Sequence, residues 1–207
     1  MRIQPIVEGH GEVSAVPVLL RRLLEAACTY EVGVNEPIRQ PRSRLVREES
    51  LRRAVRLALL QPDCAGLLIL FDADDDCPKI LAPTIQGWAQ AEARDVPCIV
   101  IMPVREYEAW FLASLESLRG MRGLGSEVVS PASPEEMRDA KGFLERHLPP
   151  GRSYMETADQ AALTARFDLG EAYTRSRSFR HLVISFGDLL RRMGAPLDSW
   201  PPSWVGP

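Results

Sequence analysis

The sequence lacks the clustered cysteines and histidines that build zinc sites, and it lacks the long apolar runs that cross membranes. Its four cysteines are widely scattered without a Cys-x-x-Cys pair, and it has only three histidines. We therefore expect no zinc centre, and free thiols in a reducing cytoplasm. No stretch reaches the ~18 apolar residues of a membrane span, and the first residues show no charged leader before an apolar core. We expect neither a membrane anchor nor a signal peptide.

Lysine is also scarce, since only Lys79 and Lys141 stand among the 25 basic residues. Phosphate recognition or a GC-rich genome would each explain the arginine excess, and we favour the genome. The formal net charge of −3 excludes a protein that binds polyanions over its whole surface, so a nucleic-acid surface must be local. The 207 residues, 45% of them hydrophobic, suffice for one α/β domain with appendages or for two small domains.

The most informative stretch is LLILFDADDDC at 67–77, where an apolar run breaks abruptly into four aspartates. Such a run predicts a strand at 65–71 that is buried on both faces of a parallel sheet, with the acids at its carboxyl end, where ligands bind. Asp72 and Asp74 point the same way in extended backbone, and their repulsion favours a divalent cation. A helix N-cap with a solvated acidic loop is the alternative. The four acids are Asp72, Asp74, Asp75 and Asp76.

Acidic residues follow two further predicted strands. Arg2–Val7 predicts a first strand that ends at Glu8, and Val96–Met102 predicts a buried strand that is followed by Glu106 and Glu108. Strands that alternate with helices indicate βαβ units, whose carboxyl ends share one edge. Convergence of separate carboxylates there supports a cation site more strongly than one cluster does. A salt-bridge network with nearby arginines is the alternative.

The whole pattern predicts an α/β fold with a Rossmann-like core. We expect a mainly parallel sheet of about four strands flanked by helices at 1–118, a helical extension at 119–195 and a proline-rich tail at 196–207, which is either an extended strap or disordered. Residues 30–38 predict a further strand, and Tyr173 with RSRSFRH is expected to separate the last two helices. Helices are predicted at 13–27, 48–60, 78–95, 135–147, 155–169 and 179–193, with another that begins at 110.

An arginine-dense segment lies between the first strand and the acidic run. Its amphipathic pattern over 48–60 places the arginines on the solvent side of a helix. Such a run is either a solvated helix face, which we slightly favour, or a phosphate-contacting patch beside a metal site. The candidate nucleic-acid-contacting arginines are Arg42, Arg44, Arg47, Arg52 and Arg53.

A strand-end glutamate followed by a strand-end Asp-x-Asp resembles the Toprim domain of topoisomerases, DnaG-type primases, RecR proteins and overcoming-lysogenization-defect (OLD) nucleases. This resemblance covers about residues 1–115. The ordered set VEGHGE, FDADDD, REYEAWFL and SRSFRHL is similar to an uncharacterised bacterial family, domain-of-unknown-function family 4276, through about residue 192. That family is itself described as Toprim-like.

The Toprim resemblance implies which residues do the chemistry. It implies that Glu8, Asp72 and Asp74 are catalytic and hold one or two Mg²⁺ (or Mn²⁺) ions, and that the glutamate also moves a proton. It further implies that Lys141 faces the scissile phosphate of a nucleic acid. The implied metal-ligand set, in which the extra acid Asp76 leaves the choice of aspartates open, is Glu8, Glu12, Asp72, Asp74, Asp76 and Glu108.

Three functions follow from the resemblance. The first is a Mg²⁺-dependent nuclease that acts on DNA or RNA. The second is a non-catalytic or conditionally active partner of a separately encoded ATPase in phage defence or DNA repair, because nuclease-branch Toprim domains work with ATPase domains and no such domain is visible here. The third and weakest is primase-like nucleotidyl transfer. The choice between a monomer and a homodimer stays open.

Overall fold

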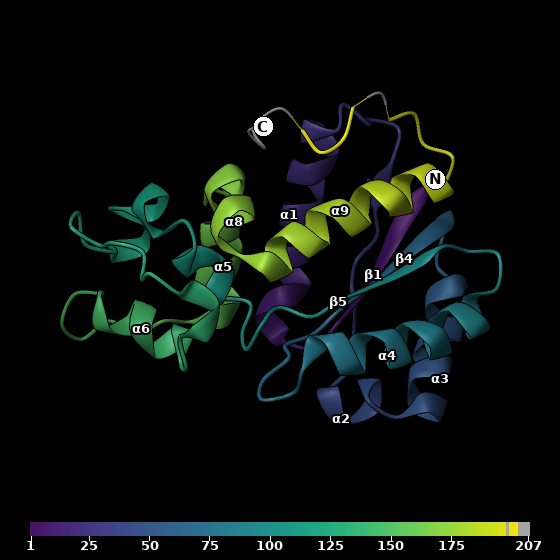
Figure 1. The fold of residues 1–207 in the computed structure, drawn as a ribbon, viewed down its shortest axis with the longest axis horizontal. Helices are drawn as coiled ribbons and strands as arrows, with labels where there is room; N and C mark the ends of the chain where they lie inside the picture. The colour runs from purple at the N-terminus through teal and green to yellow at the C-terminus, as the bar shows by residue number, and fades with distance from the viewer. Residues whose placement is uncertain (198, 203–207) are drawn as a thin grey trace.

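The computed structural model describes residues 1–197 and 199–202, and its core is a parallel β-sheet (Figure 1). The strand order is β2-β1-β4-β5, and β3 also pairs with β1. Every strand pair is parallel, which confirms the predicted α/β, Rossmann-like core. The strands are β1 (Arg2–Val7), β2 (Gly33–Val34), β3 (Ile38–Arg39), β4 (Cys64–Leu70) and β5 (Cys98–Ile101).

The single strand predicted over 30–38 was wrong, because two short strands take its place. β2 pairs with the start of β1, at Arg2 and Ile3, and β3 pairs with its end, at Ile6 and Val7. Pro37 lies between the two short strands and has no amide hydrogen to donate to a ladder. β2 and β3 therefore share one position beside β1, so the five strands of the described residues occupy four positions across the sheet.

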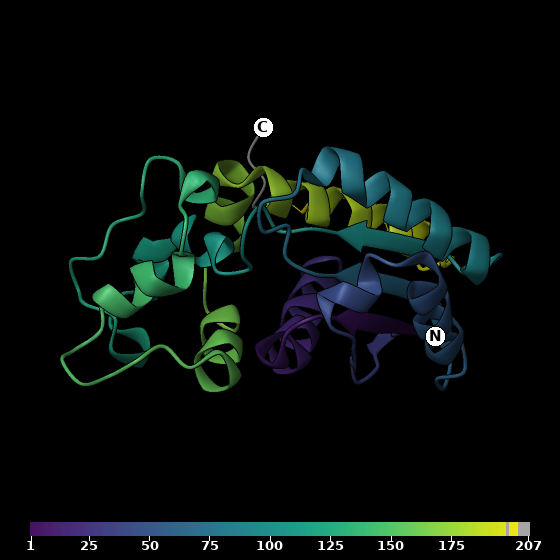
Figure 2. The same cartoon turned by 90° about the horizontal axis from the view of Figure 1, so that it is seen from below.

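Helices cover both faces of the sheet (Figure 1, Figure 2). Alternate residues of β4 point to opposite layers: Leu68 and Leu70 join the core under α1 and α9, whereas Leu67 and Ile69 join the core under α3 and α4. This arrangement explains the continuous apolar run, since both faces of the strand are buried. The helices that cover the sheet are α1 (His10–Ala26), α3 (Glu48–Leu59), α4 (Pro78–Ala93) and α9 (Arg177–Arg192).

Between β5 and α9 the chain forms shorter elements beside the carboxyl edge of the sheet (Figure 1). None of the helices in the described part of the chain is long and apolar enough to cross a membrane. The remaining helices are α2 (Arg42–Leu45), α5 (Ala109–Leu112), α6 (Ala140–Arg146), α7 (Ala161–Thr164) and α8 (Leu169–Arg175), with 3-10 turns at Leu115–Leu118, Met121–Gly123 and Pro134–Glu136 and a π-helical turn at Glu156–Gln160.

Two helices predicted in the extension, at 135–147 and 155–169, were wrong in extent, because capping residues begin new helices there, whereas α9 confirms the helix predicted at 179–193 to within two residues at each end. Asp139 has a left-handed φ of 58° and accepts a hydrogen bond from Gly142 N–H, so α6 begins after it. Asp168 caps α8, which contains Tyr173. Ser176 then caps α9 by accepting from Phe179 N–H, so most of the RSRSFRH stretch is helical. These short polar side chains satisfy the free N–H groups of each first turn.

Aromatic packing joins α5, which follows the sheet, to α9 of the extension. Trp110 of α5 lies 5.3 Å from Phe179 of α9 between ring centroids, and its indole N–H donates to Ser178 Oγ over 2.9 Å. In the tail, the Trp200 indole N–H donates to Val183 O over 2.7 Å. Trp200 therefore lies against α9, while position 198 and positions 203–207 of the predicted strap fall outside the described residues.

Candidate functional site

The strand register brings the predicted acidic positions to one edge of the sheet. Val7 of β1 pairs with Leu70 of β4, and Leu70 pairs with Ile101 of β5. The ladder continues past the strands, because Ala73 N–H donates to Pro103 O over 3.0 Å. The residues that follow all three strands therefore start from the same edge, which faces the helical extension (Figure 2).

Asp72 lies at the centre of this edge. Its Oδ1 accepts a hydrogen bond of 2.8 Å from the backbone N–H of Tyr107. Burial raises the pKa of Asp72 well above its ordinary value, and the negative charges of Glu12 and Glu108 raise it further, while Lys141 opposes them. Mutual repulsion of this kind, in a site with little water, favours a proton or a cation.

Glu108 is completely buried next to Asp72. Its Oε1 accepts hydrogen bonds from Tyr154 Oη over 2.9 Å and from Gln160 Nε2 over 3.1 Å. Its Oε2 is buried and has no hydrogen-bond partner among the described residues. Burial raises the pKa of Glu108 to about 7, against the lowering effect of Lys141. Sequence reasoning missed Tyr154 and Gln160, because no motif surrounds either residue.

Glu8 and Glu12 flank the turn between β1 and α1. Glu8 Oε2 is also buried without a partner in the described structure, and burial followed by the charge of Asp74 raises the pKa of Glu8. Glu12 Oε2 accepts from the N–H groups of Glu8 and Gly9, both over 2.9 Å. Burial raises the pKa of Glu12 to about 7. Glu12 thus caps the first turn of α1, whereas Glu8 keeps a free oxygen.

Arginines contact the other three aspartates of the run. The Arg42 guanidinium contacts Asp76 Oδ2 and the Asp72 carbonyl, and its Nε lies 3.4 Å from Asp74 Oδ2. Asp75 Oδ1 lies 3.1 Å from Arg105 and 3.3 Å from Arg138. The salt-bridge alternative therefore describes the outer acidic loop, and Asp72 remains the aspartate of this run without an ion pair in the described residues.

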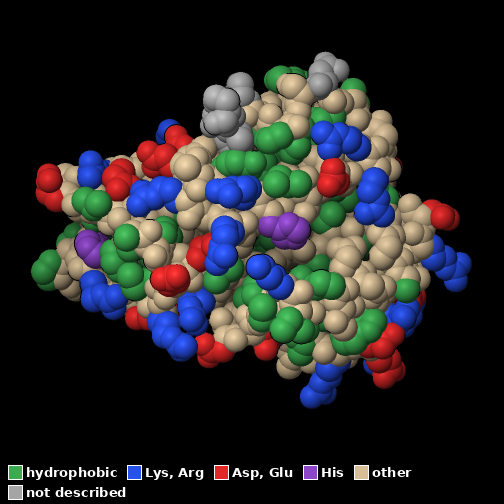
Figure 3. All heavy atoms as spheres, in the orientation of Figure 1, with side chains coloured by type: hydrophobic (Ala, Val, Ile, Leu, Met, Phe, Trp, Pro, Cys, Tyr) green, Lys and Arg blue, Asp and Glu red, His purple; other side chains and the backbone are tan. Residues whose placement is uncertain are grey.

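The rest of the arginine segment has mixed surroundings. Arg52 pairs with Glu48 and Glu92, and Arg53 pairs with Glu49. Arg44 and Arg47 are exposed. Figure 3 shows basic and acidic side chains interspersed over the face that it displays. The structure thus brings Arg42 to the acidic edge. It gives all three arginines of α3 carboxylate partners, since Arg56 also pairs with Glu92, in agreement with a solvated helix face.

Lys141 comes to the site from α6. Its Nζ pairs with Glu156 Oε1 over 2.7 Å, and its backbone N–H donates to Glu106 Oε2 over 3.2 Å. Burial lowers the pKa of Lys141, but Glu108, Glu156 and Asp72 outweigh burial and raise it above its ordinary value. Lys141 therefore stays charged near the buried carboxylates. It is the one predicted phosphate-contacting residue that the extension supplies.

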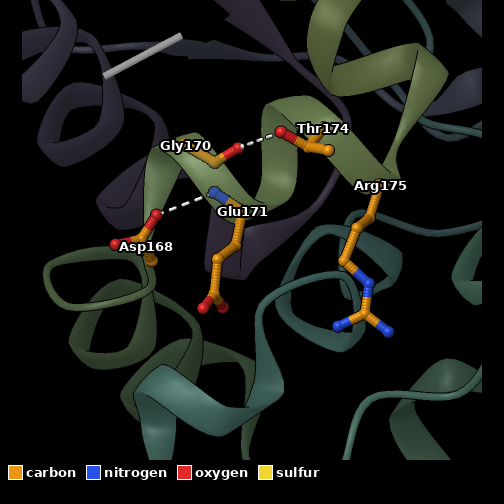
Figure 4. Close-up of a pocket in the computed structure, with 5 residues that line it drawn as sticks. All are labelled: Asp168, Gly170, Glu171, Thr174 and Arg175. Carbon is orange, nitrogen blue, oxygen red and sulfur yellow. Dashed lines mark hydrogen bonds between the residues drawn. The ribbon is translucent and has the colours of Figure 1, made fainter. Parts of the chain in front are cut away.

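Two hollows among the described residues differ in their position relative to the acidic edge. One of about 160 Å³ borders the site, and it is lined by Asp74, Asp75, Arg105, Glu106, Arg138 and Asp139. The other, of about 410 Å³, lies along α8 (Figure 4). There Asp168 accepts from Glu171 N–H and Thr174 Oγ1 donates to Gly170 O, so these polar groups serve the helix itself. The smaller hollow is the one that adjoins the carboxylates.

Fold and site together define an α/β protein with buried carboxylates at the carboxyl edge of a parallel sheet. The chain belongs to the family described as domain of unknown function DUF4276, whose model matches residues 7–185. The match includes the strand-end residues and most of the extension, so the resemblance to this family is confirmed. Searches of curated proteins and of solved structures found no match.

Proposed function

We propose that this protein is a Mg²⁺-dependent enzyme that cleaves phosphodiester bonds of nucleic acid. The observation that carries the proposal is the gathering of Glu8, Asp72 and Glu108 at one sheet edge, with buried oxygens that lack partners on both glutamates in the described residues. Carboxylate oxygens are the ligands that Mg²⁺ and Mn²⁺ prefer. A strand-end glutamate with an Asp-x-Asp also supports a Toprim-like relationship.

The donor set fits a hard divalent cation, although its geometry is not that of a finished metal site. Within the described residues no three histidine, cysteine or acidic side chains are grouped so as to hold a metal ion. Mg²⁺ needs only one or two carboxylates, because it keeps several waters and takes phosphate oxygens from its substrate. Glu8 and Asp72 would hold the ion, with Asp74 and Glu108 beside them. Asp76 and Glu12 are weaker candidates, because Arg42 contacts Asp76 closely and two backbone N–H groups donate to Glu12. Arg42 also reaches Asp74, but only over the longer distance of 3.4 Å.

The bound ion would supply Lewis-acid stabilisation of a phosphoryl oxygen. The protein's own residues supply the rest of the chemistry. Lys141, which stays charged beside Asp72 and Glu108, neutralises a phosphate oxygen. Glu8, whose pKa burial raises above its ordinary value, accepts or returns a proton. Arg44 and Arg47 are exposed and are the segment's candidates for contacting flanking phosphates.

The test combines metal binding with cleavage. Mg²⁺ and Mn²⁺ are titrated calorimetrically into the wild type, Glu8→Gln, Asp72→Asn and Asp74→Ala, and the same proteins are incubated with labelled DNA and RNA. We expect Glu8→Gln and Asp72→Asn to lose both properties, and Asp74→Ala to lose cleavage. The matched control is Asp188→Asn, an exposed carboxylate of α9 that pairs with Arg191. Full metal-dependent cleavage by Asp72→Asn would contradict the proposed site.

A further inference from the structure

Two residues of the extension hold the buried Glu108 through the same oxygen. Tyr154 Oη and Gln160 Nε2 both donate to Glu108 Oε1, over 2.9 and 3.1 Å. Rotation of the carboxylate would break both bonds, so the two oxygens are not equivalent. Oε2 is left buried and without a partner among the described residues. A buried acceptor without a partner is costly, which points to a ligand that the oxygen meets in the working protein.

The two groups that donate to Glu108, a tyrosine hydroxyl and a glutamine amide, carry no charge. A lysine or arginine at either position would cancel the charge of Glu108, whereas a hydroxyl and an amide orient the carboxylate and leave its charge available. Outer-shell hydrogen bonds of this kind fix which oxygen of a ligating carboxylate meets the metal. Burial keeps the arrangement dry, since Glu108 is 0% exposed and Gln160 is 3% exposed.

The segment that carries the two donors is itself fixed against the core. Gln160 is the last residue of the π-helical turn. Such turns are rare in proteins overall, and those that occur are often found at functional sites. The turn lies against Gly11 of α1, where an added Cβ would come within 2.8 Å of Glu156 O. Buried Asp159 accepts from Arg122 over 2.7 Å and from Met155 N–H over 2.9 Å, which holds the same turn.

We propose that Tyr154 and Gln160 are positioning residues that present Glu108 Oε2 to the divalent cation of the strand-end site. The inference rests on the proposed function, because it assigns a role within that metal site. It makes the helical extension part of the site, since a core that ended near residue 118 would leave Glu108 without both donors. Tyr154 and Gln160 act through Glu108 and touch neither the cation nor the substrate.

The first test measures metal affinity in Tyr154→Phe and Gln160→Leu of the full chain. Calorimetry with Mn²⁺ should show an affinity about 10–100-fold weaker than that of the wild type. Thr29→Val is the matched control, because it removes a fully buried hydroxyl that donates to Ala27 O instead. Thermal unfolding of each variant separates positioning from loss of fold. Wild-type affinity in a folded Tyr154→Phe would overturn the proposal.

A second readout needs no metal. The ¹³C carboxyl resonance of Glu108, assigned from its absence in Glu108→Gln, should shift in Tyr154→Phe and stay unchanged in Thr29→Val. An unchanged resonance in Tyr154→Phe would overturn the positioning role. If the wild type binds neither Mg²⁺ nor Mn²⁺, the proposed function and the role toward a cation fail together. If Glu8→Gln loses metal while Tyr154→Phe keeps it, the positioning role alone fails.

Discussion

The backbone N–H of Tyr107 donates a 2.8 Å hydrogen bond to Asp72 Oδ1, which joins the end of β4 to the turn after β5. Asp72→Asn keeps an oxygen for this bond and removes the charge that Glu12 and Glu108 repel. We predict that Asp72→Asn raises the thermal midpoint of the metal-free protein at pH 8 and lowers metal-dependent cleavage by about 100-fold or more.

Asp188→Asn is the control that shows whether a rise in thermal midpoint is specific to the acidic edge of the sheet. Asp188 is exposed and pairs with Arg191, so its substitution should change the unfolding free energy by no more than about 0.5 kcal/mol. A midpoint for Asp72→Asn below that of the wild type would show that the carboxylate is stabilising, against our interpretation of the cluster.

The buried glutamates predict an unusual pH dependence of stability. Burial raises the pKa of Glu12 and of Glu108 from 4.5 to about 7. Between these values the folded protein keeps protons that the unfolded chain has lost, so stability falls as the pH rises through this range. We expect the thermal midpoint of the metal-free protein to fall between about pH 5 and pH 8. Glu108→Gln should flatten the profile, and Mg²⁺ should raise the midpoint most at the alkaline end.

The sequence was sufficient to predict the acidic edge, because its signals are local. The bounds of β1 were predicted correctly, and the buried strand before Asp72 was predicted to within a residue at each end. A strand buried on both faces must be apolar throughout, so the first carboxylate marks its end. Parallel pairing then places those ends together without further information.

The partners of the acids could not be predicted in this way. Tyr154 and Gln160 reach Glu108 across 46 and 52 residues, Tyr154 from a loop and Gln160 from the end of the π-helical turn. Arg42 reaches Asp76 across 34 residues, and nothing in the arginine-dense segment distinguishes it from its neighbours. Side-chain contacts between irregular segments depend on the tertiary fold, which periodicity does not encode.

Arg42 is predicted to stabilise the acidic loop. Its side chain is only 19% exposed, and its guanidinium holds Asp74, Asp76 and the Asp72 carbonyl. Arg42→Gln should lower the unfolding free energy by about 1–3 kcal/mol. Arg53→Gln is the control, because its pair with Glu49 is exposed and should contribute less than about 0.5 kcal/mol. If urea unfolding showed equal losses of unfolding free energy in Arg42→Gln and Arg53→Gln, Arg42 would have no special role in the acidic loop.

Arg47, in contrast to Arg42, should affect binding rather than stability. Its side chain is exposed and makes no capping hydrogen bond to α3. If it contacts a flanking phosphate, Arg47→Gln weakens oligonucleotide binding and reduces the slope of log affinity against log salt by about 1. The thermal midpoint should not change. Fluorescence anisotropy at several salt concentrations, with EDTA present, measures the slope without cleavage, and an unchanged slope would return the arginine segment to a solvated helix face.

Gly11 provides a test of how closely the extension must sit on α1. A Cβ at Gly11 would meet Gln160 Oε1 and would come within 2.8 Å of Glu156 O. The Gln160 side chain could turn away, but the Glu156 backbone could move only with the whole π-helical turn. We therefore predict that Gly11→Ala lowers the unfolding free energy by about 1–3 kcal/mol and weakens Mn²⁺ binding by displacing Gln160 from Glu108.

Gly87 of α4 is the matched control, because an added Cβ there meets nothing within 4 Å. Gly87→Ala should stabilise the protein by about 0.5–1 kcal/mol, since alanine loses less backbone entropy in a helix, and should leave Mn²⁺ affinity unchanged. Mn²⁺ affinity that is unchanged in a folded Gly11→Ala would mean that the turn can shift without disturbing Glu108, and the metal site would then depend on the sheet edge alone.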